Sequence, residues 1–349
     1  MFFASDNSGP VHPEVLQALA EANQGYAMAY GADTLMNEVR DRIRAVFEAP
    51  GAAVYLVATG TAANSLALAT LSEPWQTVFC SPVSHIHEDE CNAPEFYSGA
   101  KLTLVPGGDK MTPEALRGSI TAEETRGVHG PQRGPVSITQ VTERGSVYSL
   151  AELQALCSVA KEYGLPVHLD GARFVNALVA LNCSPAEMTW KAGVDAVSFG
   201  GTKNGLMGVE AVIFFDESKA WEFELRRKRG AHLFSKHRYL SAQMAAYLRD
   251  DLWLKSARQA NANCARLADG LRAAGASFLH EPQANIVFAS FPRNTHKRLH
   301  EAGAVYHLWG DTLEGADEAE ALACRLVCDW SISTDQIDRF LSLLQSGKR

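Results

Sequence analysis

Residues 165–173 read Leu-Pro-Val-His-Leu-Asp-Gly-Ala-Arg, and residues 196–203 read Ala-Val-Ser-Phe-Gly-Gly-Thr-Lys. Each stretch is a short, largely apolar run that ends in polar residues and glycine, which is typical of a buried strand followed by a turn. Similar strands are expected at 53–58, 78–81, 101–105, 136–141 and 209–215, with helices at 11–24, 34–48, 62–71 and 149–163. This alternation predicts an α/β fold whose mostly parallel sheet is covered on both faces.

A chain of 349 residues favours two domains. From residue 221 the sequence changes to long helices, and short strands are expected at 277–280, 286–291, 305–309 and 325–330. We therefore predict an N-terminal segment and large domain over 1–245 and a smaller α+β domain over 246–349. Residues 121–135, rich in Gly, Pro, Arg and Glu, are expected to form a loop.

The composition of the chain indicates which kinds of binding partner and which cellular compartment are expected. The formal net charge of −8 argues against a nucleic-acid or membrane-surface partner. No apolar run approaches the length of a bilayer span, and the start of the chain has no signal-peptide pattern. Seven scattered cysteines without a Cys-x-x-Cys pair favour a reducing compartment, so a cytoplasmic location is expected.

Three motifs that offer reactive or ligand-binding groups follow expected strands. Gly60-Thr61 opens a helix, where free N–H groups can bind a phosphate, although the same pair is ordinary capping chemistry. Asp170 ends a buried strand, where it either holds a ligand or caps a turn. Lys203 follows Gly-Gly-Thr, and most such lysines are merely solvated, but an amine there can bind an aldehyde cofactor. A phosphate cradle, a carboxylate and a lysine in this order predict a site for pyridoxal 5′-phosphate (PLP).

The detail of these motifs resembles the low-specificity L-threonine aldolases, which are fold-type-I PLP enzymes. The resemblance covers the chain from Ser5 to about Trp330 and is strongest at Asp170–Arg173 and at Gly200–Lys203, within a matching segment that runs on to Asn204. Its other matching segments are Ser5-Asp6-Asn7, Ala29-Tyr30-Gly31, Gly60-Thr61-Ala62-Ala63-Asn64, His85 with Glu88, and Arg325.

On the cofactor side, the resemblance implies that Lys203 binds PLP as a Schiff base and that Asp170 pairs with the ring nitrogen. His85 would stack on the ring and handle protons. The resemblance also assigns cofactor contacts to Gly60, Thr61, Arg173 and Arg238.

On the substrate side, the resemblance implies that Arg173 and Arg325 bind the carboxylate of a small amino acid, assisted by Ser5. Tyr30 would enter the site of a neighbouring subunit. The expected assembly is therefore a homodimer or homotetramer with shared active sites.

The expected reaction is cleavage of the Cα–Cβ bond of L-threonine, L-allo-threonine or relatives such as phenylserine, which gives glycine and an aldehyde. The sequence departs from the family pattern at the general base. Some members have a histidine near the position of Thr142 that touches the substrate hydroxyl, whereas this chain has Thr142-Glu143 there. His85, Glu88 or water then remain as routes for the proton. A β-eliminating lyase or an aminotransferase would use the same Asp170 and Lys203.

A metal site is not expected. His85, His87 and Glu88-Asp89-Glu90 are a candidate cluster, but an alternating arrangement would divide these side chains between two faces. A nucleotide-dependent dehydrogenase is not expected either, because no Gly-x-Gly-x-x-Gly motif follows a first strand.

Overall fold

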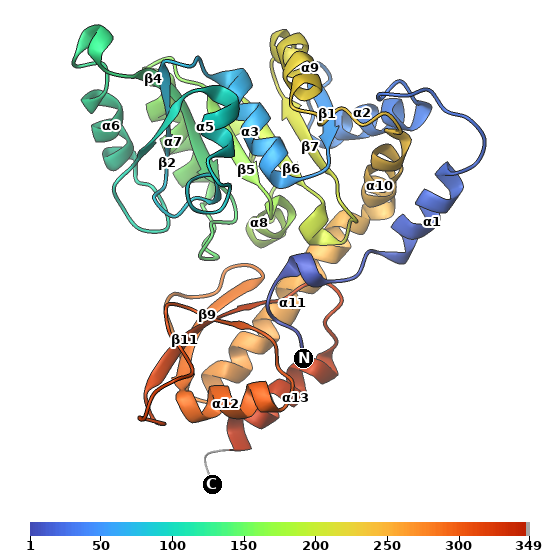
Figure 1. Cartoon of the computed structure of the whole chain (residues 1–349). Helices are drawn as coiled ribbons and strands as arrows, with labels where there is room; N and C mark the ends of the chain where they lie inside the picture. Colours follow the sequence, from blue (N-terminus) through green and yellow to red (C-terminus); the bar gives the residue numbers. More distant parts are fainter. Residues whose placement is uncertain (347–349) are drawn as a thin grey trace.

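A seven-stranded sheet forms the centre of the larger of two bodies in the computed structural model, which describes residues 1–346 (Figure 1). Strands β6, β5, β4, β2 and β3 run parallel, whereas β7 is antiparallel to both β6 and β1. The predicted α/β fold with a mostly parallel sheet is confirmed. In sheet order the strands are β1 (Ala53–Val57), β7 (Glu210–Phe214), β6 (Ala196–Gly200), β5 (Val167–Gly171), β4 (Gln132–Thr139), β2 (Gln76–Cys80) and β3 (Lys101–Leu104).

Both faces of this sheet are covered, as strand β1 shows. Its residues are all buried, and Val54 and Leu56 belong to one core cluster while Tyr55 and Val57 belong to another. Alternate side chains of a strand point to opposite faces, so each face has its own helical cover. The helices of this body are α1 (Pro13–Ala22), α2 (Thr34–Val46), α3 (Gly60–Leu71), α4 (His85–Glu88), α5 (Ala93–Ser98), α6 (Pro113–Ala122), α7 (Leu150–Glu162), α8 (Phe174–Leu181), α9 (Ala220–Arg229) and α10 (Arg238–Leu248).

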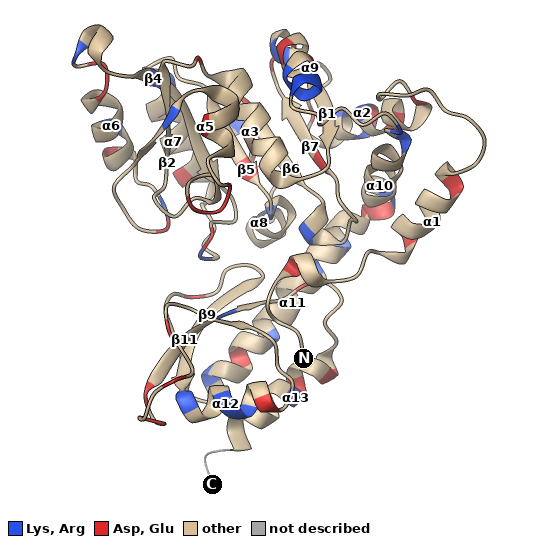
Figure 2. Ribbon diagram, in the orientation of Figure 1, with Lys and Arg blue, Asp and Glu red and all other residues tan. Residues whose placement is uncertain are grey.

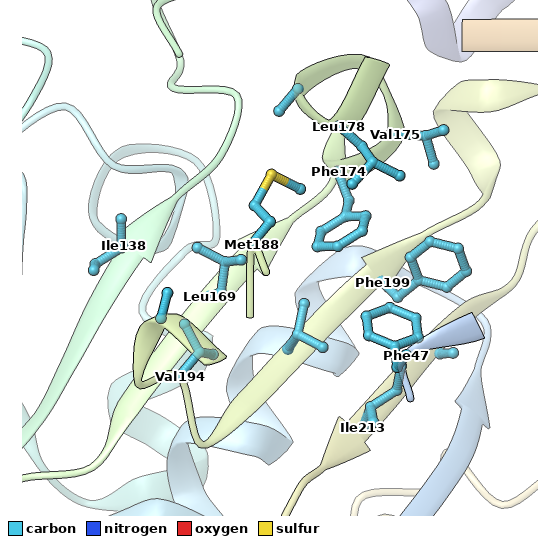
Figure 3. Packing of buried hydrophobic residues seen from close by; sticks show 14 of the residues in the cluster. Phe47, Ile138, Leu169, Phe174, Val175, Leu178, Met188, Val194, Phe199 and Ile213 are labelled. Atoms are coloured by element: carbon cyan, nitrogen blue, oxygen red, sulfur yellow. The ribbon is translucent and has the colours of Figure 1, made fainter. Parts of the chain in front are cut away.

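Aromatic side chains pack around β5 and β6, the two strands that lead to the expected site residues Asp170 and Lys203 (Figure 3). The Phe199 ring of β6 meets Phe47 at 5.6 Å and Phe174 at 5.5 Å, both in edge-to-face geometry. Leu169 of β5 and Ile213 of β7 lie in the same cluster and are fully buried. Such contacts between large buried rings add to the free energy of burial, so they keep the ends of β5 and β6 fixed relative to each other.

The smaller body contains a second sheet and a separate core. Its strands run in the order β10 (His307–Leu308), β11 (Ala321–Val327), β9 (Ile286–Pro292) and β8 (Ser277–Phe278). Helices α12 (Arg293–Glu301) and α13 (Thr334–Gln345) pack beside it, and α11 (Leu252–Ala273) runs between the bodies (Figure 1). Ala257 of α11 lies in the first core and Leu267 in the second, where Phe3 from the start of the chain also packs.

Basic and acidic residues are interspersed along the chain in both bodies (Figure 2). The basic run Arg226–Arg229 at the end of α9 is not uniformly solvated, because Arg227 is buried and its Nη1 donates to Leu56 O at 3.3 Å. Within residues 1–346, no helix is both long enough and apolar enough to cross a membrane.

The expected loop at 121–135 differs from the structure at its end. Strand β4 already begins at Gln132, and Gln132 and Arg133 pair with Gln76 and Thr77 of β2. A side chain on Gly134 would place its Cβ 2.6 Å from Thr77 O. Gly134 therefore lets β4 approach β2 closely. The prediction of a loop is wrong for residues 132–135, where glycine serves strand pairing instead of a turn.

Candidate active site

A cavity of about 350 Å³ lies where α3, α4, β5 and the turn after β6 meet. It is lined by five of the residues singled out in the sequence, which are Gly60, Thr61, His85, Asp170 and Lys203. The carboxyl ends of parallel strands meet at one edge of a sheet, which explains how residues more than a hundred positions apart converge.

Helix α3 points its first turn into this cavity. Thr59 caps the helix, since its Oγ1 accepts a hydrogen bond from Ala62 N at 3.1 Å. The first N–H groups of a helix have no acceptor within that helix and carry the positive end of its dipole. A Cβ built on Gly60 would meet no atom within 4 Å, so an anion can approach the backbone here.

Asp170 is held at the end of β5 by two N–H donors. Its Oδ2 accepts from Asn64 Nδ2 at 3.0 Å, and its Oδ1 accepts from Ala172 N at 3.1 Å. The side chain is almost fully buried, at 2% exposure, and lines the cavity. A carboxylate fixed in this way retains lone pairs that can accept a hydrogen bond from a ligand N–H.

Lys203 lies in the 3-10 turn Thr202–Asn204 that follows β6. Its amine has no hydrogen bond or ion pair within residues 1–346, although it lines the cavity. Gly200 and Gly201 before it allow close packing: a Cβ on Gly200 would lie 2.5 Å from Ala172 O, and one on Gly201 2.7 Å from Val209 O. The glycines therefore bring the lysine turn against the turn that follows Asp170.

His85 pairs with Glu90, a residue that the sequence reading did not select. His85 Nδ1 lies 2.8 Å from Glu90 Oε1. This hydrogen bond raises the pKa of His85, against the opposing effect of burial. Glu88, which was chosen from the sequence, is exposed and does not line the cavity.

The two arginines expected to bind a carboxylate lie against the N-terminal segment. Arg173 Nε and Nη2 donate to the Asp6 carboxylate at 2.7 and 3.0 Å, and both side chains are buried. Arg325 Nη2 donates to Ala4 O at 3.3 Å, and its buried Nε has no partner within residues 1–346. Ser5 Oγ accepts from Asn7 N and caps a short 3-10 turn. The Asp6–Arg173 pair was not foreseen from the sequence.

Arg238 and Tyr30 do not line the cavity. Arg238 begins α10, and its Nη1 donates to Gly25 O at 3.0 Å. Tyr30 is half-exposed, in a left-handed backbone conformation, with Lys228 Nζ 5.2 Å from its ring centroid. Both therefore lie on or near the 25–33 loop, outside the cavity that contains Asp170 and Lys203.

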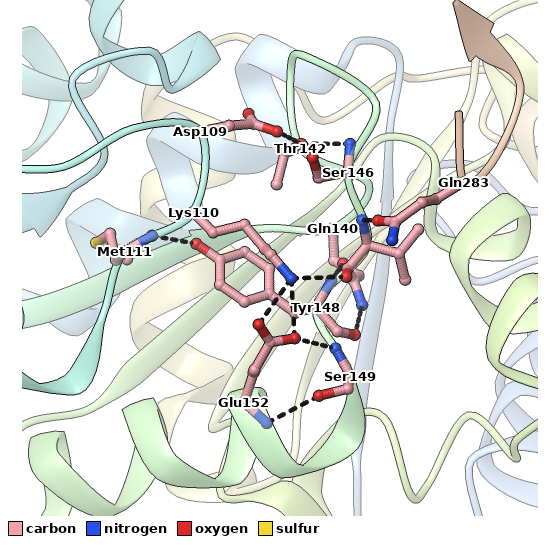
Figure 4. Close-up of polar contacts among 11 residues, drawn as sticks. Asp109, Lys110, Met111, Gln140, Thr142, Ser146, Tyr148, Ser149, Glu152 and Gln283 are labelled. Carbon is pink, nitrogen blue, oxygen red and sulfur yellow. Dashed lines mark hydrogen bonds and ion pairs between the residues drawn. The ribbon is translucent and has the colours of Figure 1, made fainter. Parts of the chain in front are cut away.

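The loop after β4 contains Glu143, and Figure 4 shows the hydrogen bonds of its neighbours Gln140 and Thr142. Gln140 exchanges two hydrogen bonds with Tyr148, and Thr142 Oγ1 donates to Asp109 Oδ2 at 2.6 Å. Thr142 does not line the cavity that contains Asp170 and Lys203. The Glu143 carboxylate has no hydrogen bond or ion pair within residues 1–346, and burial raises its pKa. The charges of Arg173 and Lys203 act on it, so it belongs to the electrostatic surroundings of the site.

Comparison with known proteins places the chain in a family. A family model described as "Beta-eliminating lyase" matches residues 3–293. The chain belongs to this family. It is 41% identical, over 339 residues, to a low specificity L-threonine aldolase of Pseudomonas aeruginosa; the match covers 96% of this chain and 94% of the relative. A protein of the same name from a Pseudomonas species is 41% identical over 94% of this chain and 92% of its own.

Solved structures agree with this membership of the β-eliminating lyase family. The threonine aldolase of Leishmania major superposes with a TM-score of 0.92 at 25% identity, covering 99% of this chain and 98% of its own. Serine palmitoyltransferase of Sphingomonas wittichii, at 17% identity and TM-score 0.73, covers 99% and 86% respectively and shares the fold.

Sequence reasoning missed three acidic residues of this family member's site: Asp6, Glu90 and Glu143. Asp6 lies within a matching segment but gave no sign of its partner, which is 167 positions away. Glu90 and Glu143 each lie close to a residue that was considered, His85 and Thr142. An acidic residue within a few positions of a considered residue is the signal that could have identified Glu90 and Glu143, whereas Asp6 had no such signal.

Proposed function

We propose that this protein is a PLP-dependent aldolase that cleaves the Cα–Cβ bond of L-threonine, L-allo-threonine and related β-hydroxy amino acids. The products are glycine and an aldehyde. The observation that carries the proposal is the convergence of Lys203, Asp170 and the first turn of α3 on one cavity. The resemblance of the whole chain to proteins named low specificity L-threonine aldolase selects this reaction among those that such a cavity supports.

The residues present fit PLP. Open space at Gly60 and the free N–H groups of α3 suit a phosphate, and the Asp170 carboxylate suits a protonated ring nitrogen. The unpaired amine of Lys203 suits covalent attachment to an aldehyde. PLP bound there supplies an electron sink for the electron pair left on Cα when the Cα–Cβ bond breaks.

The charges at the substrate side suit a single carboxylate. Arg173 and Arg325 provide two positive charges, and Asp6 neutralises one of them through its paired hydrogen bonds. Arg325 has no such paired carboxylate within residues 1–346, and its unpartnered Nε is the donor available for a substrate carboxylate. Binding the substrate carboxylate at a fixed position orients the Cα–Cβ bond for cleavage. Ser5 adjoins this position and would assist.

The hydroxyl proton must be accepted as the aldehyde leaves. His85 lines the cavity and is the first candidate. Glu143 is the second, because its carboxyl is unpaired and a raised pKa strengthens it as a base. Glu88, which is exposed, is not favoured by its position.

We further infer a homodimer or homotetramer in which Tyr30 completes a neighbouring site. Tyr26, Met28 and Tyr30 are all exposed on one loop, and exposed apolar clusters commonly mark interfaces. A cytoplasmic location is inferred from the cysteines, which are all free within residues 1–346 and suit a reducing compartment.

The test is a panel of β-hydroxy amino acids assayed for products. Equal amounts of glycine and aldehyde are expected, and a keto acid would instead favour a β-eliminating lyase or an aminotransferase. Borohydride reduction and peptide mapping should place the cofactor on Lys203. Lys203→Ala should lose turnover, whereas Lys191→Ala, which removes a surface lysine paired with Glu48, should keep it.

A further inference from the structure

A continuous hydrogen-bonded chain lies behind His85 and ends at Asp170. His85 Nδ1 lies 2.8 Å from Glu90 Oε1. The same oxygen accepts from Asn64 Nδ2 at 2.8 Å, and the second proton of that amide goes to Asp170 Oδ2 at 3.0 Å. Asn64 thus bridges two carboxylates, one behind the histidine and one at the end of β5.

Glu90 is a fully buried carboxylate that is paired with a histidine and with neither a lysine nor an arginine within residues 1–346. Its side chain has no exposed surface, and its Oε2 has no hydrogen bond within residues 1–346. Buried polar atoms without partners are rare and costly, so such a residue is seldom kept for stability alone. The neighbouring Glu88 and Asp89 are exposed.

The backbone explains why only Glu90 turns inward. Helix α4 ends at Glu88, and Cys91 and Asn92 both take left-handed conformations with φ of 50° and 58°. Two consecutive left-handed residues are uncommon outside glycine and reverse the chain sharply. Next to this reversal, Glu90 lies beside Nδ1 of the His85 ring instead of in solvent.

We propose that Glu90 is a positioning residue that fixes the His85 ring through Nδ1 and keeps a proton on that nitrogen, leaving Nε2 to face the reacting atoms. Because Asn64 donates to both Glu90 and Asp170, the same hydrogen-bonded chain fixes His85 and Asp170 relative to each other. This inference rests on the proposed function, in which His85 adjoins the cofactor and the substrate hydroxyl.

The electrostatics agree with this geometry. The hydrogen bond to Glu90 is the largest influence on His85 and raises its pKa, and burial acts in the opposite sense. The other charged groups that act on His85 are Asp170, from the end of β5, and Glu143, from the loop after β4; both raise its pKa further. Lys203 lines the same cavity.

The experiment compares Glu90→Gln with Glu88→Gln in the holoenzyme. Glu88 is two positions away and exposed, so its variant controls for the loss of one acidic charge nearby. Titration of isotope-labelled histidine by NMR should show the His85 transition about one pH unit lower in Glu90→Gln and unmoved in Glu88→Gln. A neutral His85 acting as base then predicts that the acid limb of kcat/KM moves to lower pH by the same amount.

An unshifted His85 transition in Glu90→Gln, or an unshifted acid limb, would overturn the proposal. Should Glu90→Gln fail to fold, the wild-type enzyme still decides: the nitrogen chemical shifts of neutral His85 must show the proton on Nδ1, and a proton on Nε2 refutes the inference. The NMR experiments do not depend on turnover, so an enzyme that fails the substrate panel would count against the proposed function alone.

Discussion

Replacing Asp6 with asparagine should destabilise the protein strongly, because it leaves the guanidinium of Arg173 buried without a counter-charge. Asp6 and Arg173 are 5% and 6% exposed, and two hydrogen bonds of 2.7 and 3.0 Å join them. Removing one partner of such a buried pair costs about 3–5 kcal/mol. Each charge-assisted hydrogen bond contributes about 1.5–3 kcal/mol, which gives a loss of the same order.

The matched control is Asp338→Asn. Arg266 Nε and Nη2 donate to Asp338 in the same two-pronged geometry, at 2.9 and 2.7 Å, but both side chains are about half exposed. Water and salt screen that pair, so little change is expected. The measurement is urea unfolding at matched protein concentration. If Asp6→Asn and Asp338→Asn unfold at the same urea concentration, the reasoning from burial is wrong.

The pH dependence of the Asp6→Asn effect provides a second measurement. Burial raises the pKa of Asp6, but the charge and hydrogen bonds of Arg173 outweigh it and leave the folded pKa below 3.8. A lowered folded pKa means that the carboxylate stabilises the fold above the unfolded value and loses this effect as the pH falls through the folded value. The stability difference between wild type and variant should therefore be full at neutral pH and shrink below pH 3.8.

Three further experiments test the site. Asp170→Asn should still bind the cofactor but turn over more slowly, because a neutral amide no longer holds the ring nitrogen protonated; an unchanged kcat contradicts this. Arg325→Ala should raise KM at least about tenfold while the absorption spectrum of the resting enzyme stays the same, and loss of cofactor with unchanged KM argues against carboxylate binding. Mixing inactive Tyr30→Ala and Lys203→Ala subunits should restore activity in hybrid dimers, and a mixture that stays inactive despite demonstrated exchange rules out a shared site.

Much of the fold could be predicted because its elements are encoded locally. The apolar runs that became β5 and β6 are buried along their whole length, and the glycines and polar residues that follow them mark the turns at their ends. Gly60, Asp170 and Lys203 could be selected for the same reason, since the carboxyl ends of strands in such a sheet share one edge.

Contacts between distant segments could not be predicted. The polar start of β4 became a strand because it pairs with β2, and the expected strands at 305–309 and 325–330 were displaced to His307–Leu308 and Ala321–Val327. Short strands of the smaller sheet take their bounds from their neighbours, because β propensity depends mainly on the packing that surrounds a strand.

The sequence by itself determined the parallel α/β framework and the carboxylate, lysine and helix start at its edge, because periodicity and turn chemistry act within a few residues. Only the tertiary structure decided which acidic residues contact His85 and Arg173. The turn after α4 put Glu90 instead of Glu88 beside Nδ1 of His85, and the folded chain brought Asp6 to Arg173 across 167 positions. Burial and nearby charged partners set the pKa and the contacts of a charged residue, and both exist only once the chain has folded.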